Sequence, residues 1–133
     1  MRTACAIAAA LAAGAGLSAC GPGTTADVGN IRHVITAFSE SSGPDACAYL
    51  TTGALNELFL ANGHATRDRR TALAACTAKS RDFKGSTVQI SRIWFPHDSR
   101  TASAFAHAPG GSPRWQLFLH KVGDQWQIAH IQH

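Results

Sequence analysis

Three residues of the chain, Asp45, Tyr49 and His130, carry side chains suited to proton transfer. Tyr49 is the only tyrosine, and Asp98 is the only acid within residues 86–120. A general base must lie close to the proton it removes and be shielded from water if its pKa is to approach neutrality. Asp45 also suits the start of a helix, and His130 lies among apolar neighbours that suit a hydrogen-bonded core histidine. We therefore predict no catalytic residue and keep these three as the alternative.

The seven histidines show neither the HxH nor the HExxH spacing of metal-binding motifs. A two-residue turn at Gly123-Asp124 predicts a hairpin with Leu117 opposite His130. In that pairing His120 and His130 lie on opposite faces and cannot bind one metal ion. No GxSxG motif for a nucleophilic serine occurs either. The sequence thus predicts no metal and no cofactor.

Residues 1–19 have the layout of a secretory signal peptide. Arg2 supplies a positive start, residues 6–13 are Ala, Ile and Leu, and small residues approach position 20. The stretch Leu17-Ser18-Ala19-Cys20 resembles the lipobox of bacterial lipoproteins. The resemblance implies that Cys20 is linked to diacylglycerol and becomes the first residue after cleavage. The alternative is an ordinary signal, with Cys20 a free or disulfide-bonded thiol.

A lipidated Cys20 would place the protein on the extracytoplasmic side of the cell membrane, in the cell envelope. Two acyl chains suffice for firm anchoring. Residues 20–26 are small, polar and rich in helix breakers, as expected of a tether. The remaining residues, 27–133, are enough for one domain.

The charge pattern argues against nucleic acid as a partner. The formal net charge of +4 falls to +3 when Arg2 leaves with the signal peptide. Lysines and arginines are scattered, apart from Arg67, Arg69 and Arg70, whereas nucleic-acid binding favours a clustered basic stripe with aromatic residues. We expect that arginine group to be the solvated start of a helix rather than a contact for anionic lipid.

Cys47 and Cys76 form an even pair in what would be an oxidising compartment, which favours a disulfide. The bridge would close a loop of about 30 residues and stabilise the fold by roughly 3–4 kcal/mol in the chain-entropy estimate. A redox or metal-binding pair is the competing interpretation, but the spacing matches no CxxC motif.

The mature chain divides into a helical half and a stranded half. Apolar residues at helical spacing predict an amphipathic helix over residues 27–40. Three more helices are expected: a short one opened by Pro44-Asp45, one capped by Thr51 or Thr52 and stopped by Gly63, and one from Thr66 to about Asp82.

Strands are expected over residues 87–95, 100–108, 115–122 and 125–131, as an antiparallel meander. This order, helices first and strands second, predicts the α+β class with helices packed on a curved antiparallel sheet. The hairpin pairing expected above sets Lys121 opposite Trp126. It gathers six side chains on one face: Trp115, Leu117, Leu119, Trp126, Ile128 and His130.

The order of elements and two local patterns resemble the nuclear transport factor 2-like superfamily, with its steroid-isomerase-like members. The patterns are Asp45-x-Cys47-x-x-Leu50 after a helix and the closing hairpin Gly123-Asp124-Gln125-Trp126-Gln127-Ile128. The resemblance covers residues 27–131 and implies a curved sheet wrapped around helices into a cone with a central cavity. The superfamily includes isomerases, dehydratases, pocket binders and adaptors, so the fold does not determine the function. Many members dimerise through the sheet, which makes a homodimer a candidate assembly.

The strand faces indicate which residues would line such a cone. Val88, Ile90, Arg92 and Trp94 alternate with Gln89, Ser91 and Ile93, and Ser103 and Phe105 alternate with alanines. We predict Trp94, Phe105, Trp115 and His130 as ligand-binding residues, although the same pattern also fits an ordinary core. Trp94 and Trp115 also suit an exposed patch for a protein partner.

The function expected from the sequence is therefore that of a non-catalytic lipoprotein. It would bind a small apolar ligand or another envelope protein. The alternative is an isomerase- or hydratase-like enzyme that uses Asp45, Tyr49 or His130.

Overall fold

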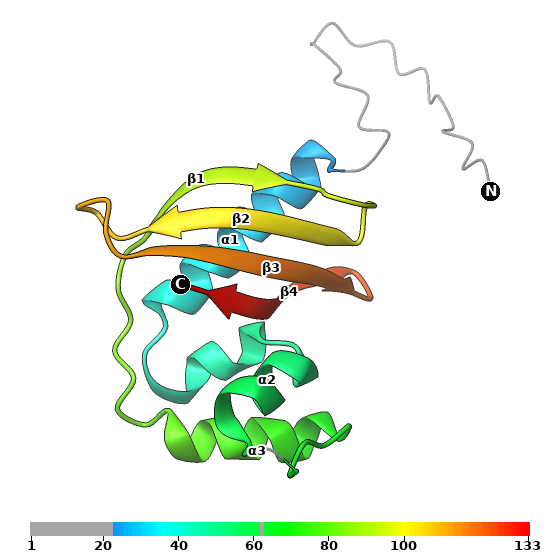
Figure 1. Cartoon of the computed structure of the whole chain (residues 1–133), viewed down its shortest axis with the longest axis vertical. Coiled ribbons are helices and arrows are strands. Elements are labelled where there is room, and N and C mark those ends of the chain that lie inside the picture. The colour runs from blue at the N-terminus through cyan, green and yellow to red at the C-terminus, as the bar shows by residue number, and fades with distance from the viewer. Residues whose placement is uncertain (1–22, 62) are drawn as a thin grey trace, which may run out of the picture.

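The computed structural model describes residues 23–61 and 63–133, so the expected signal peptide and lipid site at Cys20 lie outside the described residues. Four helices precede a four-stranded antiparallel sheet with strand order β1-β2-β3-β4, which confirms the α+β class. Figure 1 shows α1 crossing one face of the sheet, while the other helices lie beyond β4. No helix in the described ranges is long and apolar enough to cross a membrane. The elements are α1 (Thr25–Glu40), η1 (Gly43–Tyr49), α2 (Thr52–Phe59), α3 (Arg69–Lys79), β1 (Gln89–Trp94), β2 (Thr101–His107), β3 (Arg114–Val122) and β4 (Gln125–Gln132).

Helix α1 forms where the sequence predicts it and begins slightly earlier. Thr24 caps it, because its hydroxyl accepts a hydrogen bond from the backbone N–H of Asp27 at 3.1 Å. Thr25 and Ala26, expected in the tether, therefore lie in the helix. Ile31 and Ile35, one turn apart, are fully buried against the sheet.

Helix α3 begins later than predicted, because Asp68 rather than Thr66 caps it. The Asp68 carboxylate accepts hydrogen bonds from the backbone N–H groups of Arg70 and Thr71, while the Thr66 hydroxyl accepts one from the Asp68 N–H. An ionised carboxylate at this position also meets the positive end of the helix dipole. The helix ends at Lys79 instead of near Asp82.

The sequence predicted that Arg69, in the first turn of α3, would be solvated, but in the structure it has hydrogen-bond partners within the protein. Its guanidinium donates hydrogen bonds to the carbonyl oxygens of Leu50 at 2.8 Å and Ala48 at 3.3 Å. It thereby joins α3 to the end of η1 and to Leu50, which follows that helix.

The sheet is not strongly curled, in contrast to the cone predicted from the superfamily resemblance. Its four strands are six to nine residues long. Three alanines of β2, each at most 2% exposed, lie on the inner face of the sheet and belong to the buried core. The buried core combines Ile31 and Ile35 of α1 with residues of β2, β3 and β4, namely Ala102, Ala104, Ala106, Leu117, Leu119, Trp126 and Ile128.

A β-bulge in β4 corrects the predicted pairing of the last hairpin. Near the turn the prediction holds, with Lys121 opposite Trp126. The register then shifts, so that Leu119 pairs with Ile128 but Phe118 pairs with His130, leaving Ala129 as the extra residue. The predicted Leu117–His130 pair is therefore wrong. His130 turns to the outer face of the sheet, away from α1.

A second bulge changes the faces of β1. Ile90 pairs with Ala106 and Arg92 with Phe105, so Ser91 is the extra residue. The sequence had placed Ile90 and Arg92 on one face. In the structure Ile90 packs on the core, whereas Arg92 points outward.

The disulfide between Cys47 and Cys76 is confirmed. It joins η1 to α3 with Cα atoms 6.1 Å apart, and both residues are at most 2% exposed. The backbone of Thr51 adds a second link, donating to the carbonyl of Ile128 in β4 at 2.9 Å. The helices beyond β4 are thus tied both to each other and to the sheet.

Candidate functional site

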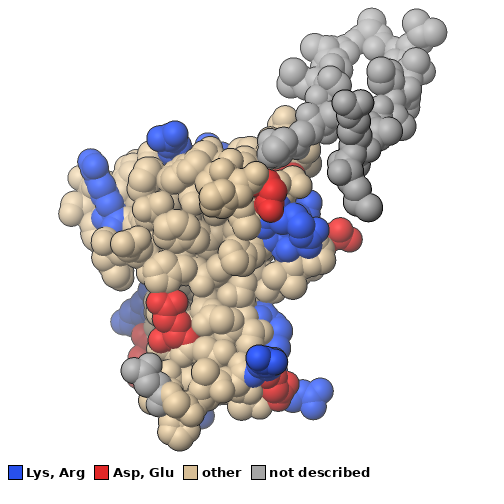
Figure 2. All heavy atoms as spheres, turned by 45° about the vertical axis from the view of Figure 1, so that its right-hand side comes forward, with Lys and Arg blue, Asp and Glu red and all other residues tan. Residues whose placement is uncertain are grey.

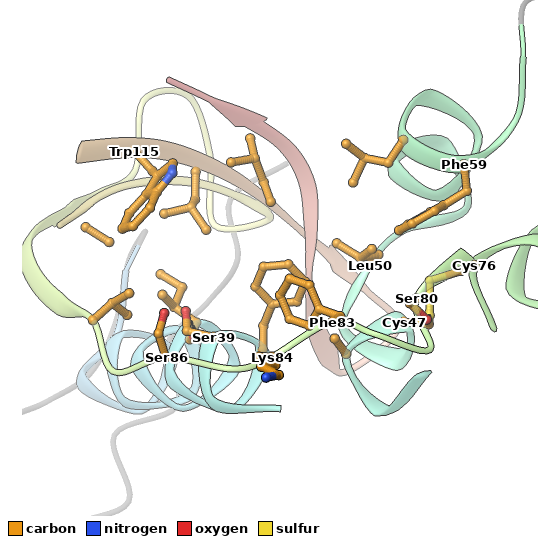
Figure 3. Close-up of a pocket in the computed structure, with 18 of the residues that line it drawn as sticks. Ser39, Cys47, Leu50, Phe59, Cys76, Ser80, Phe83, Lys84, Ser86 and Trp115 are labelled. Carbon is orange, nitrogen blue, oxygen red and sulfur yellow. Dashed lines mark hydrogen bonds between the residues drawn. A yellow bond between two sulfur atoms is a disulfide. The ribbon is translucent and has the colours of Figure 1, made fainter. Parts of the chain in front are cut away.

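A cavity of about 600 Å³ lies between the inner face of the sheet and the helices. One wall is the C-terminal half of α1, another is the sheet, and η1, α2 and α3 close the third side (Figure 3). Its apolar lining comes from α1, η1, α2, the strands and the segments between elements: Ile35, Phe38, Ala46, Leu50, Leu58, Phe59, Phe83, Val88, Ala106, Trp115, Leu117 and Ile131.

The segment between α3 and β1 forms the remaining wall. It runs alongside the end of α1, where the Ser86 N–H donates to the Ser39 carbonyl at 2.7 Å and the Gly43 N–H donates to the Phe83 carbonyl at 2.8 Å. Gly85 is required for this approach, because a Cβ there would lie 2.2 Å from the carbonyl oxygen of Glu40. The close contact holds this segment, which lines the cavity, against the end of α1.

The interior of the cavity offers few polar groups to a ligand. Ser39 already donates to the carbonyl of Ile35 at 2.8 Å, and the Ser80 hydroxyl lies 3.5 Å from the sulfur of Cys47. Figure 3 shows the Trp115 indole at one end of the cavity and the Cys47–Cys76 disulfide near the other. A concave apolar wall with few polar groups is typical of a site for a small apolar molecule.

Charged and exposed residues surround the mouth of the cavity. Leu58 is 49% exposed and Phe83 is 43% exposed, so both offer apolar surface at the entrance. Lys79 donates to the carbonyl of Phe59 at 2.6 Å, and Asp82 and Lys84 are exposed at the rim. Because charges of both signs surround the mouth, they do not favour a ligand of one particular charge.

The four residues predicted to bind a ligand separate onto two faces of the sheet. Trp115 lines the cavity. Trp94, Phe105 and His130 lie on the outer face, opposite α1, because of the two bulges and the alternation of β2. The structure therefore does not bring these four side chains together.

The three candidate catalytic residues also lie apart from the cavity lining. Asp45 is exposed in the first turn of η1, and Tyr49 is half-buried at the end of that helix. On the outer face, Nδ1 of His130 lies 2.9 Å from a carboxylate oxygen of Glu57, and both side chains are substantially exposed. Within residues 23–61 and 63–133 no group of three His, Cys, Asp or Glu residues is placed to hold a metal ion.

A buried carboxylate that the sequence did not single out lies at the start of α1. Asp27 is 6% exposed and accepts hydrogen bonds from Trp126 Nε1 and Lys121 Nζ, each at 3.0 Å, and from the Thr24 hydroxyl at 2.9 Å. Burial by itself raises the pKa of Asp27, but these hydrogen bonds and the Lys121 charge outweigh it and hold the pKa below 3.8.

No local sequence signal connects Asp27 with its two partners in the sheet, because they lie 94 and 99 residues further along the chain. An acid in the first turn of a helix is explained locally by the helix dipole. Only the fold brings the indole and the ammonium group to the same carboxylate.

No protein-family model, curated protein or solved structure matches the chain. The geometry alone therefore defines its class, an α+β domain with an apolar cavity between its sheet and its helices.

Proposed function

We propose that this protein is a membrane-anchored, extracytoplasmic lipoprotein that binds a small apolar ligand in the cavity between sheet and helices, without catalysis. The observation that carries the proposal is the cavity of about 600 Å³, which lies within the size range of small-molecule sites. Trp115, Phe59 and Leu50 give it the apolar walls that such a ligand requires.

The anchoring part of the proposal comes from the sequence Leu17-Ser18-Ala19-Cys20. A disulfide between Cys47 and Cys76 suits an exported protein, because disulfides persist in oxidising compartments. The proposal also includes a relationship to the nuclear transport factor 2-like superfamily, in a form whose sheet is more open. Its support is the order of helices before a four-strand meander.

The enzymatic alternative requires an acid or a histidine beside the bound ligand. Asp45, Tyr49 and His130 are not among the residues that line the cavity. The three predicted residues therefore do not support an isomerase- or hydratase-like reaction at this site. Asp82 and His133 do line the cavity, and both are exposed.

A neutral apolar probe tests ligand binding. We expect N-phenyl-1-naphthylamine to bind the wild-type protein saturably, with increased and blue-shifted emission. Ser86→Phe places a ring at the cavity mouth and should weaken binding about tenfold, or about 1.4 kcal/mol. Ser99→Phe makes the same substitution in the exposed β1–β2 turn and should leave binding unchanged.

Equal probe affinity in Ser86→Phe and wild type, with unchanged thermal stability, would exclude this cavity as the site. Anchoring is tested separately by mass spectrometry of the protein from a bacterial host. In the wild type we expect Cys20 to be the new N-terminal residue and to carry diacylglycerol. The Cys20→Ala variant cannot carry this lipid, so we expect it to be released from the membrane fraction.

A further inference from the structure

The outer face of the sheet carries a cluster of aromatic side chains that the cavity does not use. We call Arg92, Trp94, Phe105 and Phe118 the outer aromatic face. The rings of Trp94 and Phe105 lie 5.0 Å apart, and the Arg92 guanidinium lies 4.9 Å above the Trp94 ring. Phe105 is 40% exposed, so the cluster presents apolar surface to its surroundings.

The aromatic rings cover the middle of this face. Ser103 lies between Trp94 and Phe118 in the register of the sheet and is only 2% exposed, although it points away from the core. A large apolar face flanked by polar strand residues is typical of a surface that contacts a partner or a membrane.

The charges on the strands are of one sign. No residue of β1 to β4 is Asp or Glu. Of the strand cations, Lys121 pairs with Asp27, and the Arg114 side chain donates to the Gly111 carbonyl at 3.1 Å. Other acids lie at the margins of the sheet: Glu57 of α2 pairs with His130, and Asp98 and Asp124 lie in the turns β1–β2 and β3–β4. Figure 2 shows uncharged atoms over much of the sheet, with charged side chains mainly at its margins.

The start of the described chain lies at the end of β1, which is the edge of the sheet nearest to the proposed lipid anchor. Gly23 packs directly on the ring of Phe95, since a Cβ there would lie 2.2 Å from that ring. Phe95 directly follows Trp94 at the end of β1, although its own ring lies on the core side, against Trp126. Cys20 precedes Gly23 by three residues, which span at most roughly 11 Å. An acyl chain on Cys20 would therefore hold the bilayer within reach of the β1 edge of the sheet.

We propose that the outer aromatic face rests on the surface of the bilayer that holds the lipid anchor, with Trp94 and Phe105 among the headgroups and Arg92 on lipid phosphate. Trp and other aromatic residues favour the membrane interface, and arginine adds attraction to anionic lipid. The absence of acids from the four strands makes this face complementary to an anionic surface. The inference rests on the lipid anchor of the proposed function. It places the cavity on the side of the sheet that faces away from the membrane.

Fluorescence quenching by brominated lipid tests the contact. The lipidated protein, checked by mass spectrometry, is incorporated into vesicles of equal parts phosphatidylcholine and phosphatidylglycerol. The acyl chains of these lipids are brominated near the headgroup. The difference between wild type and Trp94→Phe isolates the emission of Trp94, and we expect this emission to be quenched.

Matched charge reversals provide the second comparison. Arg92→Glu should reduce the quenching of Trp94 about fivefold or more, because it replaces a favourable contact with anionic lipid by a repulsive one. Arg81→Glu makes the same charge change on the exposed segment after α3 and should leave the quenching unchanged.

The outcomes separate this inference from the proposed function. Unquenched Trp94 in a protein that carries its lipid would overturn the membrane contact alone, and cross-linking of this face to an envelope protein would overturn it in favour of a protein partner. If Cys20 carries no lipid, the anchor and the contact that rests on it both fail. Binding of N-phenyl-1-naphthylamine in the cavity is independent of all three outcomes.

Discussion

Asp27 shows how one side chain connects distant parts of the chain. Its carboxylate is held at the first turn of α1 by Thr24 and accepts hydrogen bonds from Lys121 in β3 and Trp126 in β4. The Trp126 indole is almost fully buried, so its N–H has little access to water as an alternative partner. Because α1 begins directly after the proposed tether, this cluster fixes the point at which the domain would leave its anchor.

Asp27→Asn should lower the free energy of unfolding by about 1.5–3 kcal/mol at neutral pH, the usual size for a hydrogen bond to a charged group. The pKa of Asp27 is lowered in the folded state, so its charge stabilises the fold above the ordinary value of 3.8. That contribution should disappear as the pH falls below 3.8 and through the folded-state pKa. Urea denaturation of both proteins across this pH range measures the difference.

Glu40→Gln, which neutralises an exposed acid at the end of α1, is the matched control and should change stability by less than about 0.5 kcal/mol. The pKa values of Asp68, which accepts from the Thr71 hydroxyl, and Asp98, which accepts from the Arg100 N–H, are lowered as well. The stability of both the wild type and Asp27→Asn therefore still depends on pH in the acid range. A wild-type advantage that stays constant down to the lowest pH would contradict the role given to Asp27.

At the scale of the elements, two single-residue bulges decide which side chains reach the cavity. The bulge at Ala129 turns His130 outward and leaves Ile131 to line the cavity. The bulge at Ser91 turns Arg92 and Trp94 outward in the same way. One extra residue reverses the face of every residue beyond it, because side chains alternate along a strand.

The register of β4 predicts a sharp difference between two neighbouring substitutions. Ile128→Ala should destabilise the protein by about 2–5 kcal/mol, since Ile128 is fully buried between the sheet and the helices. His130→Ala should cost less than about 1 kcal/mol, because the His130 side chain is 43% exposed and its ion-pair partner Glu57 is exposed as well. Guanidinium denaturation measures both, and a large loss in His130→Ala would support the unbulged pairing instead.

At the scale of the whole molecule, the cavity exists because the helices are divided between two places. Helix α1 covers the sheet, whereas η1, α2 and α3 extend past β4, as Figure 1 shows. The space between them is bridged by the segment from α3 to β1 and closed by the Cys47–Cys76 disulfide. The wall of the cavity therefore depends on the link that holds η1 to α3.

Replacement of both cysteines, Cys47→Ser with Cys76→Ser, should lower the free energy of unfolding by roughly 3–4 kcal/mol, from the closed loop of about 30 residues. The same change should weaken binding of N-phenyl-1-naphthylamine, because both cysteines line the cavity. Denaturation and probe titration measure the two effects. A reducing agent should lower the stability and the probe affinity of the wild type to those of the double variant. It should leave both quantities unchanged in the variant itself. Full probe affinity in a folded double variant would show that the bridge does not shape the cavity.

Local patterns in the sequence determined the elements of this protein and their order. Apolar spacing marked α1, alternation marked β2, and Gly123-Asp124 marked the last hairpin with Lys121 opposite Trp126. Once Cys5 and Cys20 are assigned to the predicted signal peptide and lipid site, Cys47 and Cys76 remain as a pair, which was enough to predict their disulfide. These features follow from interactions between residues near in sequence or from simple chemical pairing.

The tertiary structure alone decided the faces and the curvature of the sheet. A bulge depends on how a strand fits its neighbour and the helix layer, so no alternation within β1 or β4 revealed the outward turn of Trp94 and His130. The open sheet and the place of the cavity depend on where η1, α2 and α3 pack relative to β4. The Asp27–Trp126 contact likewise joins residues 99 positions apart, and only long-range packing brings them together.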